Sequence, residues 1–271
     1  MVRSLWTAAS GMKSQQINVD TIANNLSNVN TTGYKTEVNE FKSLLYQTPQ
    51  TETTTANGAN KPTSAQVGMG VRNAAINSIF KQGPMLASTS STAFAIEGDG
   101  FFKVSGQDGN TYYTRNGNFV LSEGVGGLTL ATTDGLPVLD TNDRPIVFGA
   151  DIVGSKITIT GDGTFCYPDE NNNPQSLGIT VGLVQFNNPG GLEKEDGSLF
   201  SATAASGDPM SEATTQGLTR SKVVQGYLEG SNVQVVDEMV NLITAQRAYE
   251  LNSKAITASD EMMQQANQLR R

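Results

Sequence analysis

The chain has 271 residues, of which 37% are hydrophobic and 16% are charged, and its formal net charge at pH 7 is −8. It contains no histidine and a single cysteine, Cys166, which excludes Ser-His-Asp and Cys-His catalysis, imidazole metal sites and an internal disulfide framework. No run approaches the about 18 consecutive apolar residues of a membrane helix, and the acidic charge argues against a nucleic-acid partner. We therefore expect no enzymatic activity, no cofactor, no metal and no membrane span.

The segment from Arg3 to Val29 predicts a long helix, because it contains no proline and only one glycine. Apolar residues recur there at seven-residue spacing, which places them on one stripe of a helix. We name these residues the N-terminal seam: Leu5, Met12, Val19, Ile22, Leu26 and Val29.

A short second helix is expected after Gly33, a residue that can adopt the positive φ with which helices end. Its apolar positions fall at i, i+4, i+7 and i+11, and they are Tyr34, Val38, Phe41 and Leu45. Residues 46–66 then predict an extended connector, because they are rich in Thr, Asn, Gln and Ala.

Residues 67–220 predict a β domain. Short runs such as Phe101–Val104 and Thr111–Thr114 are typical of strands, and Asp-Gly and Asn-Gly dipeptides recur between such runs. These dipeptides favour tight hairpin turns, so we expect a mostly antiparallel arrangement.

A second long helix is expected near the C-terminus. Its apolar spacing defines a C-terminal seam of Val235, Met239, Leu242, Tyr249, Ile256 and Met263. The predicted fold class is α+β, with long terminal helices that form a coiled-coil-like helical domain from residues 1–45 and 221–271.

Each seam needs a partner, and two arrangements provide one. The two helices can pair within one chain, or both can pack against other copies. A second apolar row on the C-terminal helix, which includes Leu251 and Met262, favours packing between copies, because one partner helix cannot cover two stripes.

Candidate chemical motifs are weak. Gly98-Asp99-Gly100 and Gly68-Met69-Gly70 lack the remaining residues of a nucleotide-binding loop and are better explained as turns. The clustered carboxylates are best explained as solvated loops, although a hydrolytic pair stays open. Cys166 lies between Phe165 and Tyr167, which predicts a buried, unreactive thiol.

Both ends of the chain resemble bacterial flagellar rod and hook proteins, the axial proteins of the flagellum. The segment Ala23–Lys35 resembles their N-terminal signature, in which the matching residues are Asn24, Asn25, Asn28, Asn30 and Gly33. Gly230–Met239 and Gln246–Lys254 are similar to their C-terminal motifs, and Met1–Met12 resembles the distal rod members specifically.

The resemblance implies a structural subunit of the distal rod. Such subunits form a rigid helical homopolymer that spans the periplasm, transmits torque from motor to hook and encloses the export channel. Implied partners are the proximal rod proteins, the hook protein, the P and L ring proteins and the flagellar type III export apparatus. The N-terminus has no apolar region typical of a secretory signal, so we expect export without a cleaved signal peptide.

Phe41 and Leu45 resemble the export-gate recognition pattern of these substrates, Phe-x-x-x-apolar. Packing of a short amphipathic element explains the same spacing. The alternatives to a distal rod subunit are a hook or proximal rod protein, and, more distantly, a wall-acting hydrolase or a β-rich adhesin.

Overall fold

A computed structural model describes residues 2–50, 65–124, 127–149, 152–169, 173–215 and 217–269. The chain divides into two compact units. The first unit contains residues 1–27, 37–77 and 234–271, and the second contains residues 28–36 and 78–233.

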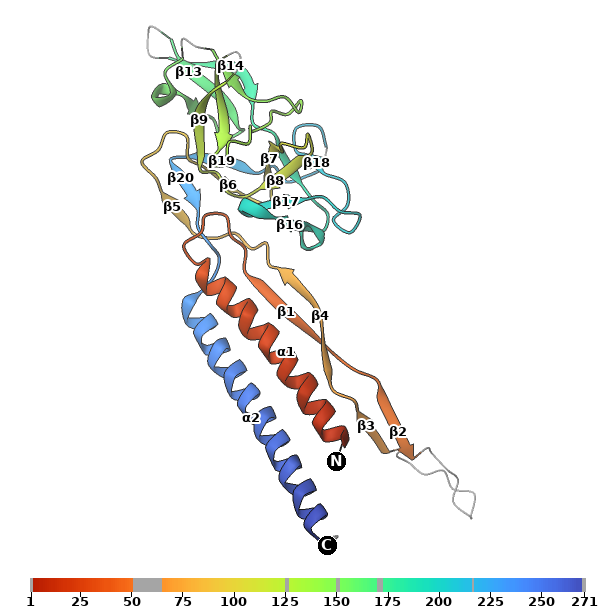
Figure 1. The fold of residues 1–271 in the computed structure, drawn as a ribbon. Coiled ribbons are helices and arrows are strands. Elements are labelled where there is room, and N and C mark those ends of the chain that lie inside the picture. The colour runs from red at the N-terminus through yellow and green to blue at the C-terminus, as the bar shows by residue number, and fades with distance from the viewer. Residues whose placement is uncertain are drawn as a thin grey trace. The chain divides into compact units, whose positions relative to one another are not determined.

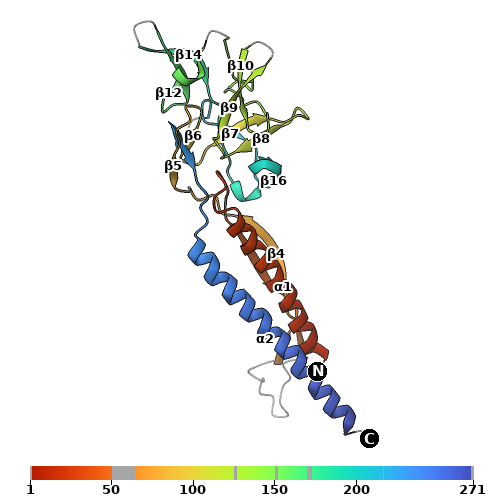
Figure 2. The same cartoon turned by 60° about the vertical axis from the view of Figure 1, so that its left-hand side comes forward.

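Two helices form much of the first unit. Helix α1 (Val2–Ser27) and helix α2 (Val235–Gln268) lie side by side (Figures 1 and 2). They are antiparallel, because Ser4 near the start of α1 contacts Ser259 late in α2, and Asn25 contacts Glu238 at the other end.

The predicted coiled-coil-like helical domain is wrong. Among the described residues α1 and α2 are the only α-helices, and strands cover more of the chain than helices do. The first unit itself contains strands β1 (Glu37–Ser43), β2 (Tyr46–Gln50), β3 (Ala65–Gly68) and β4 (Val71–Ser78).

The expected second helix at residues 34–45 is instead strand β1, which pairs with β4 and contacts α1. The Asn25 side chain accepts a hydrogen bond from Glu37 N and donates one to Glu37 O, as a neighbouring strand would. Short isolated helices are marginal in water, so these partners outweigh the helical spacing of the apolar residues.

The ends of the predicted connector form a hairpin, in which Tyr46 pairs with Gly68 and Gln47 with Val67. Residues 51–64 of that connector lie outside the described part of the chain.

The second unit is built of β-structure, and its strand pairs are antiparallel. Its largest sheet has the order β16 (Glu193–Glu195), β17 (Leu199–Ser201), β8 (Thr111–Thr114), β7 (Phe101–Ser105), β15 (Leu183–Gln185) and β18 (Met210–Ser211).

The described residues of the second unit form four smaller sheets as well. Two have three strands, β11 (Val147–Phe148), β10 (Gly127–Thr132) and β9 (Phe119–Gly124), and β12 (Thr158–Ile159), β13 (Thr164–Pro168) and β14 (Pro174–Thr180). Two have two strands, β19 (Lys222–Gln225) with β6 (Phe94–Glu97), and β20 (Tyr227–Glu229) with β5 (Met85–Ala87).

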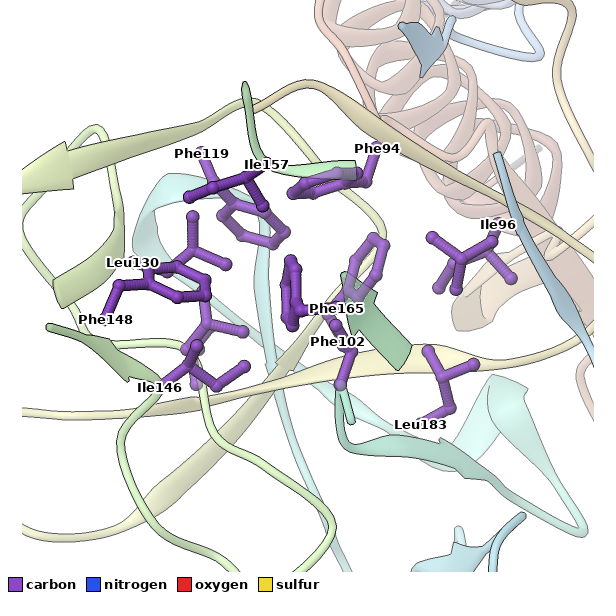
Figure 3. Packing of buried hydrophobic residues seen from close by; sticks show 14 residues of the cluster. Phe94, Ile96, Phe102, Phe119, Leu130, Ile146, Phe148, Ile157, Phe165 and Leu183 are labelled. Atoms are coloured by element: carbon purple, nitrogen blue, oxygen red, sulfur yellow. The ribbon is translucent and has the colours of Figure 1, made fainter. Parts of the chain in front are cut away.

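Strand β7 divides the core of the second unit into two clusters, because successive side chains of a strand point to opposite faces. Phe102 packs in the larger cluster, with its ring 5.1 Å from that of Phe119 (Figure 3). Its neighbour Phe101 packs in the smaller cluster against Phe200, at 6.1 Å. Cys166 on β13 is buried, as its apolar neighbours predicted.

Candidate assembly interface

Helices α1 and α2 contact each other through small and polar residues at seven-residue intervals. Ser4 Oγ lies 3.3 Å from Ser259 Oγ, and a Cβ on Gly11 would lie 2.9 Å from Asn252 Nδ2. Two heptads after Gly11 along α1, the Asn25 side chain forms a hydrogen bond with the Glu238 carboxyl of α2. Since residues seven apart share one stripe of a helix, these contacts define a continuous contact line.

The contact line buries few large apolar side chains. On α2 its fully buried members are Glu238, Ala245 and Ser259. Small residues let two helices approach closely, whereas they remove little apolar area from water. The pairing of α1 with α2 therefore leaves much of the apolar surface of α2 without a partner.

The opposite face of α2 carries that apolar surface. With about 3.6 residues per turn, a cluster of four apolar residues lies on the side of α2 away from Glu238 and Ala245. Leu251 and Met262 are also exposed, but they lie on other sides of the helix, and Met262 is close to the contact line. The exposed fractions of the four clustered residues are 74% for Val236, 51% for Met239, 57% for Val240 and 50% for Ile243. We call these four residues the outer face of α2. Contiguous exposed apolar surface of this kind marks an interaction site.

Some of the predicted seam residues are covered in the structure, whereas others are exposed. In the N-terminal seam Ile22 is buried, and the other five members are half-buried. In the C-terminal seam Leu242, Ile256 and Met263 are half-buried, whereas Val235, Met239 and Tyr249 are exposed. The apolar spacing in the sequence does not predict the contact line, because the contact line consists of small and polar residues.

The signature asparagines make local contacts around the end of α1. Asn25 is buried against the backbone of Glu37, and Asn24 Nδ2 lies 3.3 Å from Glu37 Oε2. In the second unit, Thr31 donates from its backbone N to Asn28 O and from its hydroxyl to Asn28 Oδ1. Asn30 is exposed.

Gly33 occupies a position that only glycine fits. Its φ is +71°, and a Cβ there would lie 2.6 Å from the backbone N of Asn116. Its own N–H donates to Glu229 O at 2.8 Å. The close approach of two backbones explains this member of the signature.

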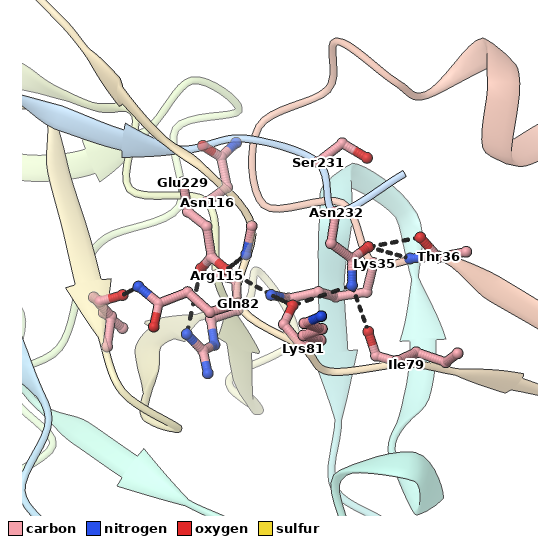
Figure 4. Close-up of polar contacts among 12 residues, drawn as sticks. Lys35, Thr36, Ile79, Lys81, Gln82, Arg115, Asn116, Glu229, Ser231 and Asn232 are labelled. Carbon is pink, nitrogen blue, oxygen red and sulfur yellow. Dashed lines mark hydrogen bonds and ion pairs between the residues drawn. The ribbon is translucent and has the colours of Figure 1, made fainter. Parts of the chain in front are cut away.

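Figure 4 shows a buried charge cluster of Lys35, Arg115 and Glu229 in the second unit. Glu229 accepts from Lys35 Nζ at 2.6 Å and from Arg115 Nη1 at 3.3 Å, and all three side chains are at most 1% exposed. Gly83 N also donates to this carboxylate, at 2.9 Å. We call Lys35, Arg115 and Glu229 the junction cluster, because it joins the segments that follow α1 and precede α2 in the sequence.

Burial is the main influence on the two cations of the junction cluster. It lowers the pKa of Lys35 and the pKa of Arg115, while the Glu229 carboxylate opposes both shifts. The sequence could not reveal this cluster, because 194 positions separate Lys35 from Glu229.

Asn232 reinforces the same junction (Figure 4). Its Oδ1 accepts from Thr36 N at 2.8 Å and from Thr36 Oγ1 at 2.7 Å, and its Nδ2 donates to Ile79 O at 2.9 Å. Within the second unit, side-chain hydrogen bonds of Asn232 thus connect the segment that follows α1 in the sequence with the segment that precedes α2.

The two residues of the predicted export pattern lie in and after β1. Phe41 is 39% exposed on the strand, and Leu45, which follows it, is 87% exposed. Neither side chain belongs to a buried cluster among the described residues.

No group of acidic, histidine or cysteine side chains in the described ranges could hold a metal ion. Neither helix that the structure describes is long and apolar enough to cross a membrane.

Three family models match successive parts of the chain. A flagella basal body rod protein model matches residues 5–35, and a flagellar hook protein FlgE/F/G D1 domain model matches residues 95–167. A flagellar basal body rod FlgEFG protein C-terminal model matches residues 224–269. These ranges include most of α1, part of the second unit and all of α2.

Curated relatives match over the full length. The flagellar basal-body rod protein FlgG of Borreliella burgdorferi is 45% identical, with 100% of both chains covered. FlgG of Agrobacterium fabrum is 40% identical, over 96% of this chain and 97% of its own, and FlgG of Bacillus subtilis is 36% identical over 100% of both.

The chain therefore belongs to the family of bacterial flagellar basal-body rod proteins. Its full-length relatives carry the name FlgG, and the predicted role of a structural subunit of the distal rod is confirmed.

Proposed function

We propose that copies of this chain assemble through the outer face of α2 and the two predicted seams into the helical tube of the rod. The exposed apolar side chains of the outer face carry this proposal, since α1 covers only the opposite side of α2. Burial stabilises such contacts by about 25 cal/mol per Å² of apolar surface.

The proposed polymerisation contacts lie in the helices of the first unit, within the predicted ranges 1–45 and 221–271, and the predicted β domain corresponds mainly to residues 78–233 of the second unit. In this arrangement the tube spans the periplasm, encloses the export channel and transmits torque to the hook. Its further partners are the proximal rod proteins, the hook protein and the P and L ring proteins.

The chain reaches the tube through the flagellar type III export apparatus without a cleaved signal peptide, and Phe41 and Leu45 are the proposed recognition residues. Their exposure supports this proposal, because neither side chain is required for a buried cluster among the described residues.

Electron microscopy of purified hook–basal bodies, with gold label directed at residues 67–220, tests the placement. We expect label along the rod between the membrane rings. Label confined to the hook or to the proximal rod would contradict the distal position.

A further inference from the structure

A half-open cavity of about 290 Å³, lined by both polar and apolar side chains, lies in the first unit between α1, β1 and α2. Its lining includes Asn18 and Thr21 from α1, Asn39 from β1, and Glu238 and Asn241 from α2. Since liquid water occupies about 30 Å³ per molecule, the cavity has room for a side chain as well as for water.

Asn39 is the unusual member of this lining. The residue is 9% exposed, and both Oδ1 and Nδ2 are buried without a hydrogen-bond partner among the described residues. Buried amides are nearly always hydrogen-bonded, because an unpaired polar group costs about 1–3 kcal/mol. The Asn39 side-chain amide therefore requires a hydrogen-bond partner that the described residues do not supply.

Glu238 adds a carboxylate to the same cavity. It is 8% exposed, and burial raises its pKa, although the hydrogen bond from Asn25 opposes that shift. Glu238 forms no ion pair within the described part of the chain. A buried carboxylate without a cation is costly, so the cavity favours a positively charged group.

The terminal helices also carry cations that form no ion pair with any residue in the part of the chain that the structure describes. These cations are Arg3, Lys13, Arg247 and Lys254, and all four are exposed. An arginine or lysine head group supplies several donors and no acceptor, which suits both the Asn39 carbonyl and the Glu238 carboxylate.

We propose that this cavity receives an arginine or lysine side chain from a terminal helix of a second copy of the chain. The proposal rests on the self-assembly proposed above and gives it a specific polar contact. The outer face of α2 then supplies apolar area, and the cavity fixes the register between neighbouring copies, because a charge left unpaired there is costly.

The variant Glu238→Gln distinguishes an effect on the proposed contact between copies from an effect on folding of the single chain. In the isolated chain we expect unchanged or slightly higher stability to denaturant, because a neutral amide is easier to bury than a carboxylate. In isolated hook–basal bodies we expect salt to release at least about fivefold more of the variant than of the wild type. Glu250→Gln, at an exposed site on α2, is the matched control and should change neither quantity.

Asn39→Leu is the second variant. It removes the unpaired amide from the isolated chain, so its stability should not fall, whereas its release from hook–basal bodies should again increase. Equal release of wild type, Glu238→Gln and Asn39→Leu would overturn the proposal and would indicate a cavity filled by water.

The partner is identified by combining Glu238→Gln with Arg3→Gln, Lys13→Gln, Arg247→Gln or Lys254→Gln in turn. For one of the four, the double variant should release no more chain than either single variant, since the two residues then act through one contact. Additive release for all four would contradict the proposed occupant. Absence of the wild-type chain from hook–basal bodies would instead overturn self-assembly itself.

Discussion

At the level of single residues, the junction cluster buries three charged side chains in the second unit. One carboxylate, Glu229, contacts both Lys35 and Arg115, so two buried cations depend on it. Removing one partner of a buried pair costs more than the pair contributes, because the charge that remains has no counterion.

Glu229→Gln is therefore expected to lower the free energy of unfolding by about 3–5 kcal/mol. Glu123→Gln, at an exposed position on β9, is the control and should lie within about 0.5 kcal/mol of the wild type. Denaturant unfolding of the two purified variants measures the difference. A loss below about 1 kcal/mol for Glu229→Gln would show that the cations find other partners.

Gly33→Ala and Gly109→Ala separate backbone strain from steric clash. Both glycines have positive φ, +71° and +81°, but a Cβ on Gly109 meets nothing within 4 Å, whereas one on Gly33 meets Asn116 N at 2.6 Å. We expect a loss of about 1–2 kcal/mol for Gly109→Ala, from strain alone, and a clearly larger loss for Gly33→Ala. Equal losses in thermal or denaturant unfolding would contradict the close approach.

At the scale of elements, the seven-residue spacing predicted the two helices well. The expected helix at residues 3–29 corresponds to α1, and the runs Phe101–Val104 and Thr111–Thr114 correspond to β7 and β8. Local patterns suffice there, because each element satisfies its own backbone hydrogen bonds or pairs with a nearby strand.

The pairing of elements could not be predicted in the same way. Strand β1 forms where helical spacing predicted a helix, since its partners are β4 and the Asn25 side chain. The contact line between α1 and α2 consists of residues such as Gly11 and Asn252, which carry no hydrophobic signal. Both features depend on residues distant in the sequence.

Ser259→Leu tests the contact line. Ser259 is 4% exposed on α2 with its Oγ 3.3 Å from Ser4 Oγ, and a larger side chain there must push the helices apart, which typically costs about 1–3 kcal/mol. Ala255→Leu, a change to leucine at an exposed position of α2, should be nearly neutral. Hydrogen exchange in α1 gives the readout: faster exchange is expected only for Ser259→Leu, and equal rates in both variants would contradict close packing at this site.

At the scale of the whole molecule, export and assembly make different demands on the same chain. The proposed export residue Phe41 is 39% exposed and belongs to no buried cluster among the described residues, so its removal should change secretion without unfolding the protein. We expect Phe41→Ala to reduce secreted protein while cellular expression stays normal. Val38→Ala, at a 43% exposed position on the same strand, is the control, and wild-type secretion of Phe41→Ala would refute the export role.

Assembly of the proposed tube depends on the outer face of α2. A monomer with such a face folds without burying it, and the apolar area is buried only where copies meet. Each large apolar side chain contributes about 1.5–3 kcal/mol when fully buried, so one charge in this face should prevent incorporation without disturbing the fold.

The most direct test is to quantify Val240→Asp in purified hook–basal bodies by immunoblot, alongside Val120→Asp as the control. Val240 is 57% exposed on the outer face, and Val120 is 42% exposed on β9 in the second unit. We predict that Val240→Asp folds and is exported but is absent from the rod, whereas Val120→Asp is incorporated normally. Rods that contain Val240→Asp at the wild-type level would contradict assembly through the outer face of α2.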